Sequence, residues 1–275
     1  MASDAHAHPG DLLDRFPGAE EERRRLGTAC AAVAWNLRDF ERHEELARKA
    51  RDEGAAPLAL CFAVHPQLPA ALSGKAEVRR HVADLEKLAA EGRIRAVGET
   101  GFDLFNQAFR TTEALQEELF RAHLEIAARY GLPAVLHIRR AMHKVFAHTK
   151  ALKKLPAVVF HAYSGTFAEG EALLKRGVNA WFSFGTAILL NHKTAMESCA
   201  RLPRERLLLE TDAPYQPLRG APFSRWADLP AILAGAAGLR RGDKAELEAA
   251  VDENWNRVFA DPSYPPHRPE EVFTA

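Results

Sequence analysis

Short apolar runs alternate with longer amphipathic stretches along almost the whole chain. The eight runs are residues 5–8, 29–34, 58–64, 94–98, 134–137, 157–160, 180–184 and 206–210. Most of them lack the apolar–polar alternation of a half-exposed strand, so we predict strands that are buried on both faces. Strands of this kind are typical of parallel sheets covered by helices, which makes this pattern the strongest constraint on the fold.

The stretches between the runs place apolar side chains three or four residues apart. Helices are predicted at residues 40–53, 78–91, 113–130, 167–176 and 244–259. Eight strands that alternate with helices predict an α/β fold, a TIM (β/α)8 barrel. An open doubly wound sheet is the alternative, because periodicity alone does not show that a sheet closes.

The length of the chain fits one barrel domain. It has 275 residues, and a TIM barrel typically needs about 250. We therefore predict a single barrel over residues 1–260 and a proline-rich surface tail over residues 261–275. Residues 10–27 are polar and charged, and we predict a loop with a short helix there.

Composition limits the kind of partner and the compartment. The formal net charge is zero, so no global basic field attracts nucleic acid, although a local rim of lysine and arginine would suffice. The three cysteines show no C-x-x-C spacing and are predicted to be buried, reduced thiols. No signal peptide is apparent, and no apolar run approaches the roughly 20 residues that span a bilayer. A cytoplasmic protein without membrane contact is expected, and the oligomeric state stays open.

Six residues with metal-binding side chains stand where the apolar runs end. They are His6, His8, Glu99, His137, His161 and Asp212. Because parallel strands end at one rim of a barrel, these imidazoles and carboxylates are predicted to meet there. Each has a simpler explanation when taken alone, such as a surface carboxylate or a hydrogen-bonded core histidine. The repeated position favours a metal site.

Local spacing supports this interpretation. His6 and His8 are two residues apart on a strand and so point to the same side. The two oxygens of Glu99 could each bind one cation, and Thr100 and Gly101 after it predict a tight turn.

Six segments together resemble the TatD family of metal-dependent deoxyribonucleases, within the amidohydrolase superfamily. They are residues 4–8 (DAHAH), 62–66 (FAVHP), 97–103 (VGETGFD), 136–139 (LHIR), 160–165 (FHAYSG) and 209–215 (LETDAPY). They stand in family order, and the resemblance covers residues 4–259. The sequence departs from the family's pattern at three places: at Ala162, where the family commonly has Cys, at Arg140, where it commonly has Asp, and in residues 218–223.

The resemblance implies a TIM barrel with two divalent metal ions. It implies that His6, His8 and Asp212 hold one ion, that His137 and His161 hold the second, and that Glu99 bridges them. These ligands suit Zn, Mn or Fe and admit Mg, and the sequence does not choose among them. Two such ions can activate a shared water as nucleophile. Asp212 is the candidate proton acceptor, so Asp212 and Glu99 are the predicted catalytic residues.

Four further residues are predicted to contact the substrate. Arg139 could bind a phosphate with two parallel hydrogen bonds, or it could be a solvated surface residue. His65 could contact substrate or serve the structure. Asp103 could orient Arg139 or a loop, or form a structural ion pair, and Tyr163 could line the pocket.

The leading hypothesis is a metal-dependent phosphodiesterase, an exonuclease-like deoxyribonuclease with DNA ends or single strands as substrate. A hydrolase of small amides, esters or lactones from the same superfamily is the first alternative, because the same activated water would serve. A non-catalytic metal-stabilised scaffold that binds nucleic acid or protein is the second.

Overall fold

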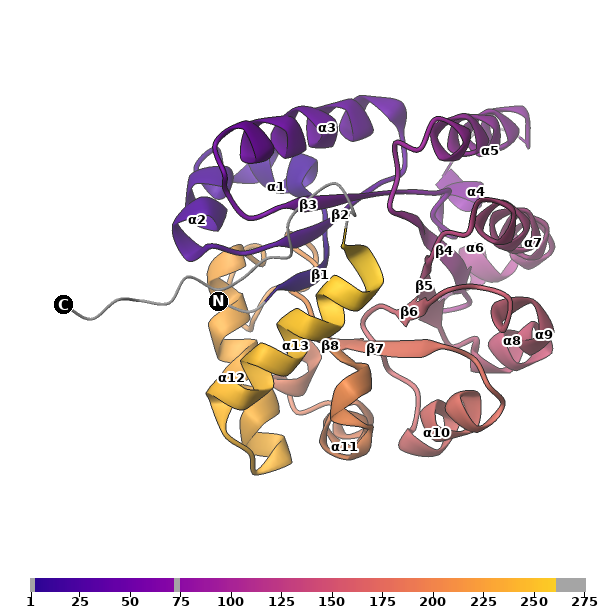
Figure 1. Cartoon of the computed structure of the whole chain (residues 1–275). Coiled ribbons are helices and arrows are strands. Elements are labelled where there is room, and N and C mark those ends of the chain that lie inside the picture. Colours follow the sequence, from indigo (N-terminus) through magenta and orange to yellow (C-terminus); the bar gives the residue numbers. More distant parts are fainter. Residues whose placement is uncertain (1–2, 72–74, 261–275) are drawn as a thin grey trace.

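Eight parallel strands follow one another in chain order around a central barrel, with helices outside it (Figure 1). The computed structural model describes residues 3–71 and 75–260. The strands are β1 (Asp4–Ala7), β2 (Cys30–Ala34), β3 (Leu58–Phe62), β4 (Ala96–Asp103), β5 (Ala134–Arg139), β6 (Val158–Phe160), β7 (Ala180–Phe184) and β8 (Leu207–Leu209). The predicted TIM barrel is confirmed.

Hydrogen bonds between the first strand and the segment after the last strand close the barrel. The backbone N–H of Asp212 donates to the carbonyl of His6 at 2.9 Å, and the N–H of His8 donates to the carbonyl of Ala213 at 2.8 Å. The hydroxyl of Thr211 donates to the buried carboxylate of Asp4 at 2.6 Å. These contacts join the two ends of the sheet, so the open-sheet alternative is wrong.

Helices fill the connections. They are α1 (Pro9–Arg15), α2 (Ala19–Leu26), α3 (Leu37–Asp52), α4 (Leu68–Ala71), α5 (Lys75–Ala90), α6 (Gln107–Arg110), α7 (Glu113–Tyr130), α8 (Met142–Ala147), α9 (Thr149–Leu152), α10 (Phe167–Lys175), α11 (Lys193–Arg201), α12 (Leu229–Arg240) and α13 (Lys244–Phe259). Three 3-10 turns cover Thr186–Ile188, Arg204–Arg206 and Trp226–Asp228. The predicted helices 113–130 and 244–259 have the predicted bounds.

Two differences from the predicted elements have local causes. Helix α3 begins three residues earlier than predicted because the side chain of Asn36 caps it by accepting the N–H of Asp39 at 3.0 Å. Residues 10–27, predicted to be a loop with a short helix, contain two helices, α1 and α2, and α1 begins with Pro9 at a first-turn position that tolerates proline.

Strand β4 runs further than its apolar residues suggested. It continues through Asp103, so Glu99 lies inside the strand and the turn predicted at Thr100 and Gly101 is wrong. Gly101 pairs with His137 of β5 at φ 142°. A Cβ at Gly101 would lie 2.2 Å from the carbonyl oxygen of His137, so the close pairing of β4 and β5 requires glycine there.

One end of the barrel is closed by the last helix. Helix α13 crosses this end in Figure 1, and the indole N–H of its Trp255 donates to the carbonyl of Asp4 at 3.1 Å. Trp255 and Phe259 pack in one buried cluster with inward side chains of the strands, such as Val33 and Leu208. The opposite end, where the strands finish, is therefore the end left for a site.

Three predictions bear on the rest of the chain. The cysteines Cys30, Cys61 and Cys199 are free and buried, as predicted. Within residues 3–71 and 75–260, no helix is both long enough and apolar enough to cross a membrane. The predicted tail, residues 261–275, lies outside the described residues.

Candidate metal centre

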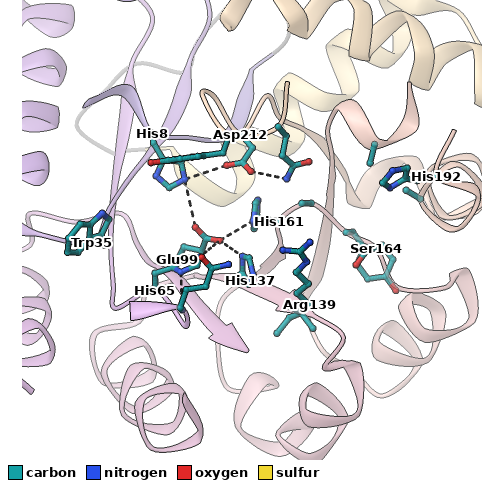
Figure 2. A pocket seen from close by; sticks show the side chains of 18 of the residues that line it. His8, Trp35, His65, Glu99, His137, Arg139, His161, Ser164, His192 and Asp212 are labelled. Atoms are coloured by element: carbon teal, nitrogen blue, oxygen red, sulfur yellow. Dashed lines mark hydrogen bonds and ion pairs between the residues drawn. The ribbon is translucent and has the colours of Figure 1, made fainter. Parts of the chain in front are cut away.

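The six predicted metal-binding residues meet at the mouth of the barrel. Figure 2 labels His8, Glu99, His137, His161 and Asp212 there. The six residues come from five parts of the chain. His6 lies in β1 and His8 directly follows it, Glu99 lies in β4, His137 in β5, and His161 and Asp212 just after β6 and β8. They lie at or beside the inner wall of a cavity of about 1010 Å³. The structure thus brings together the six side chains that were predicted to meet.

Glu99 stands between two groups of imidazoles. Its Oε2 lies 3.3 Å from Nε2 of His6 and 3.8 Å from Nε2 of His8. Its Oε1 lies 2.7 Å from Nδ1 of His137 and 3.0 Å from Nε2 of His161. Each oxygen therefore serves one group, which is the arrangement that a carboxylate bridging two cations needs.

Asp212 completes the first group. Its Oδ1 lies 3.6 Å from Nε2 of His6 and 3.4 Å from Nε2 of His8. The residue has a φ of 50°, in the left-handed region that is costly for a residue with a Cβ. The N–H bond to the carbonyl of His6 and the bond from the amide of Gln216 to Oδ2, 2.8 Å, hold it in this conformation.

His6 shows that the centre suits a cation. Its side chain is fully buried, and neither ring nitrogen has a hydrogen-bond partner among the described residues. A buried polar atom without a partner is costly. A divalent ion beside Nε2 would satisfy it, because nitrogen and carboxylate donors lie within 4.8 Å of one another in the group of His6, His8 and Asp212.

The electrostatics agree with this arrangement. Burial raises the pKa of Glu99, but the surrounding imidazoles outweigh it and hold the pKa well below its usual value. Burial lowers the pKa of His6, and the neighbouring His161 lowers it further. Metal ligands have to be deprotonated. The shifts favour that state for Glu99 and His6. At His8, His137 and His161 burial lowers the pKa, but the neighbouring carboxylates outweigh it and raise the pKa, so binding of a cation there would release protons.

A second layer of side chains fixes the candidate ligands. Oε1 of Glu210 lies 3.1 Å from Nδ1 of His161 and accepts the N–H of Ala162 at 2.7 Å. Oδ2 of Asp103 lies 3.1 Å from Nε2 of His137. Such partners set the orientation and basicity of a ligating histidine. The sequence analysis did not predict a role for Glu210. An acidic residue directly after three leucines of a strand could have indicated a site residue.

The four predicted substrate contacts lie in different surroundings. His65 and Arg139 line the cavity. Nε2 of His65 lies 3.2 Å from Oε1 of Glu99, so His65 belongs to a third group of possible metal ligands, together with Glu99 and His137. The sequence analysis predicted a substrate contact or a structural role for His65 and did not predict this position among the possible metal ligands.

The polar ends of Asp103 and Tyr163 bond to other parts of the protein. The carboxylate of Asp103 is fully buried and bonds to Gln67, His137 and the N–H of Phe105. Asp103 was expected to orient Arg139 or a loop, or to form a structural ion pair. Among the described residues it bonds to the loop after β4 and to His137, and no bond to Arg139 is present. The hydroxyl of Tyr163 donates to the carbonyl of Thr166 at 2.9 Å, so the ring borders the cavity while its polar end serves the fold.

Comparisons with known proteins agree on one family. The family model for TatD related DNase matches residues 3–260. The "3'-5' ssDNA/RNA exonuclease TatD" of Cronobacter sakazakii is 39% identical over 187 residues, 64% of this chain and 69% of the relative. The protein of the same name from Shigella flexneri serotype 5b is 34% identical over 234 residues, 82% of this chain and 84% of the relative.

A solved structure gives the same result. The TatD homologue YJJV from Escherichia coli k12 superposes with a TM-score of 0.79 at 28% identity, over 95% of this chain and 98% of that one. The barrel, its mouth and these similarities lead to one conclusion: the chain belongs to the TatD-related DNase family.

Proposed function

We propose that this chain is a metal-dependent, exonuclease-like phosphodiesterase that shortens single-stranded DNA or RNA from the 3′ end. The relatives carry the name of that activity. Within the structure, the observation that carries the proposal is the position of Glu99, whose two oxygens are divided between two groups of imidazoles.

We assign two divalent ions to the centre. His6, His8 and Asp212, whose donor atoms lie within 4.8 Å of one another, would hold one ion. His137 and His161, which both lie beside Oε1 of Glu99, would hold the other, and Glu99 would bridge the two. His65 is a further candidate ligand on the second side. When bound, such a pair activates a water as nucleophile and neutralises charge on a phosphodiester.

The protein's own groups would position the substrate and move the proton. Oδ1 of Asp212 points toward the centre, and its pKa is lowered because burial is outweighed by the bond to His8 and the charges of neighbouring histidines. We propose that this oxygen accepts the proton of the attacking water. Arg139 stands beside His137 on the cavity wall and would bind the phosphate (Figure 2).

The cavity favours a nucleic acid over a small neutral substrate. Its volume of about 1010 Å³ lies at the upper end of small-molecule sites, which span roughly 300–1,000 Å³. Two positively charged side chains, those of Arg139 and Lys193, line its walls. A hydrolase of small amides, esters or lactones needs neither feature. The cytoplasmic location stays a prediction, supported by the three free, buried cysteines.

Hydrolysis of labelled oligonucleotides tests the proposal. The wild-type protein should release mononucleotides from the 3′ end of single-stranded DNA in the presence of Mg, Mn or Zn. Glu99→Ala should abolish the metal-dependent release, whereas Glu171→Ala on the outer surface of α10 should retain it. Equal, metal-independent activity in wild type and Glu99→Ala would reject the proposal.

A further inference from the structure

Three arginines converge on one short segment at the mouth of the barrel. The guanidinium carbon of Arg139 lies 3.7 Å from the ring centroid of Phe105, and that of Arg140 lies 4.7 Å from it. Nη1 of Arg140 donates to the carbonyl of Phe105 at 3.4 Å, and Nη1 of Arg110 donates to the neighbouring carbonyl of Leu104, also at 3.4 Å. We call Arg110, Arg139 and Arg140 the arginine rim.

The part of the chain that the structure describes does not neutralise the charges of the arginine rim. Among the described residues, none of its three members has a carboxylate within 4.0 Å. Elsewhere on the surface arginines pair with acids, as Arg48 of α3 does with Glu45 and Asp52 at 2.8 Å each. The nearby acid Asp103 is fully buried and bonded to other groups. The arginine rim therefore has excess positive charge in a chain whose net charge is zero.

The hydrogen-bonding capacity of the arginine rim is also largely free. A guanidinium has five N–H donors. For Arg110 and for Arg140 the structure shows one long bond to a carbonyl oxygen each. Phe105, itself 40% exposed, orients the guanidinium groups through its ring and offers no acceptor beyond its carbonyl. Donors that are held in place but lack acceptors suit a ligand that brings its own negative oxygens.

The position of the rim indicates which ligand this is. Arg139 also lines the cavity that contains the metal centre, whereas Arg110 and Arg140 lie outside its wall. A polyanion with one phosphate at the centre would extend its next phosphates over the arginine rim. A mononucleotide or small ester would reach no further than Arg139.

We propose that Arg110 and Arg140 form, with Arg139, a subsite for the backbone phosphates of single-stranded nucleic acid next to the scissile bond. This inference rests on the proposed function. It assigns to this chain a preference for substrates longer than a dinucleotide, set by binding of phosphates and not by base identity.

Binding of a fluorescein-labelled oligothymidylate, measured by anisotropy in excess chelator, tests the subsite without turnover. The double variant Arg110→Gln/Arg140→Gln should bind about tenfold more weakly. Its slope of log Kd against log salt should fall by about 0.7 for each phosphate that the variant no longer neutralises. The matched control is Arg51→Gln, because Arg51 is an exposed arginine in the last turn of α3, at the closed end of the barrel.

A strand with neutral methylphosphonate linkages separates binding of phosphates from other effects. Wild type and double variant should bind this strand equally. The subsite is refuted if the double variant binds the ordinary strand like Arg51→Gln, or if it weakens binding of both strands alike. A parallel assay of oligonucleotide hydrolysis distinguishes the two proposals. If binding depends on the arginines but no cleavage occurs, only the enzymatic function is refuted. If cleavage occurs but binding does not depend on the arginines, only the subsite is refuted. Absence of both binding and cleavage in the wild type refutes both.

Discussion

At the scale of single residues, the centre depends on groups that orient the candidate ligands. Glu210 is fully buried and bonds through one oxygen to both Nδ1 of His161 and the N–H of Ala162. Burial lowers the pKa of His161, but Glu99 and Glu210 outweigh this and hold it well above its usual value. Glu210 thus controls both the direction and the basicity of one imidazole.

Replacement of Glu210 should weaken metal binding without removing a ligand. We expect Glu210→Ala to lower the affinity for divalent metal by about 10- to 100-fold, as removal of such outer partners does. Glu210→Gln should have a smaller effect, because its amide oxygen can still accept one bond. Calorimetric titration of both variants measures this, and wild-type affinity in Glu210→Ala would contradict the assignment.

At the scale of elements, the pairing of β4 with β5 places Glu99 beside His137. Gly101 makes this pairing possible. Gly101→Ala should lower the free energy of unfolding by at least about 2 kcal/mol, because the added methyl meets a backbone carbonyl and φ is positive. The control is Gly238→Ala in α12, where a Cβ meets nothing within 4 Å and helix propensity predicts a gain of about 0.5–1 kcal/mol. Chemical denaturation compares the two, and similar effects would show that the close approach is unimportant.

Helix α7 is tied by His123 to strand β4 and to the segment that follows β3. Nε2 of this buried residue accepts the N–H of Val64 at 3.1 Å, and Nδ1 lies 3.0 Å from the hydroxyl of Thr100. Burial lowers the pKa of His123 from 6.5 to about 4. Since the folded state disfavours the charged form, its contribution is complete above pH 6.5 and is lost as the pH falls toward 4.

Acid should therefore destabilise the wild type more than a variant without this histidine. Between about pH 7.5 and pH 5, the free energy of unfolding should fall by about 2 kcal/mol more in the wild type than in His123→Gln. Urea denaturation of both proteins in chelator, at the two pH values, measures the free energies of unfolding. The contributions of other titrating groups cancel when the pH dependence of the variant is subtracted from that of the wild type. The same pH dependence in both proteins would refute the role of His123.

At the scale of the whole molecule, the sequence predicted the barrel and the meeting of six residues because both follow from strand order. Parallel strands end at one rim whatever their exact lengths, so errors in strand bounds did not matter. The predicted end of β4 was wrong because Glu99, Thr100 and Asp103 are polar side chains, which suggested that the strand had ended. The pairing with β5 nevertheless buries them. The positions of His65 and Asp103 relative to His137 were not predictable, because they depend on side-chain directions across three strands.

The central claim is that the mouth of this barrel holds two divalent ions on either side of one carboxylate. Anomalous scattering from crystals grown with Mn or Zn measures this directly. The account predicts two peaks, one among His6, His8 and Asp212 and one beside His137 and His161, with Glu99 between them. A single peak, or none near Glu99 in metal-saturated crystals, would contradict it.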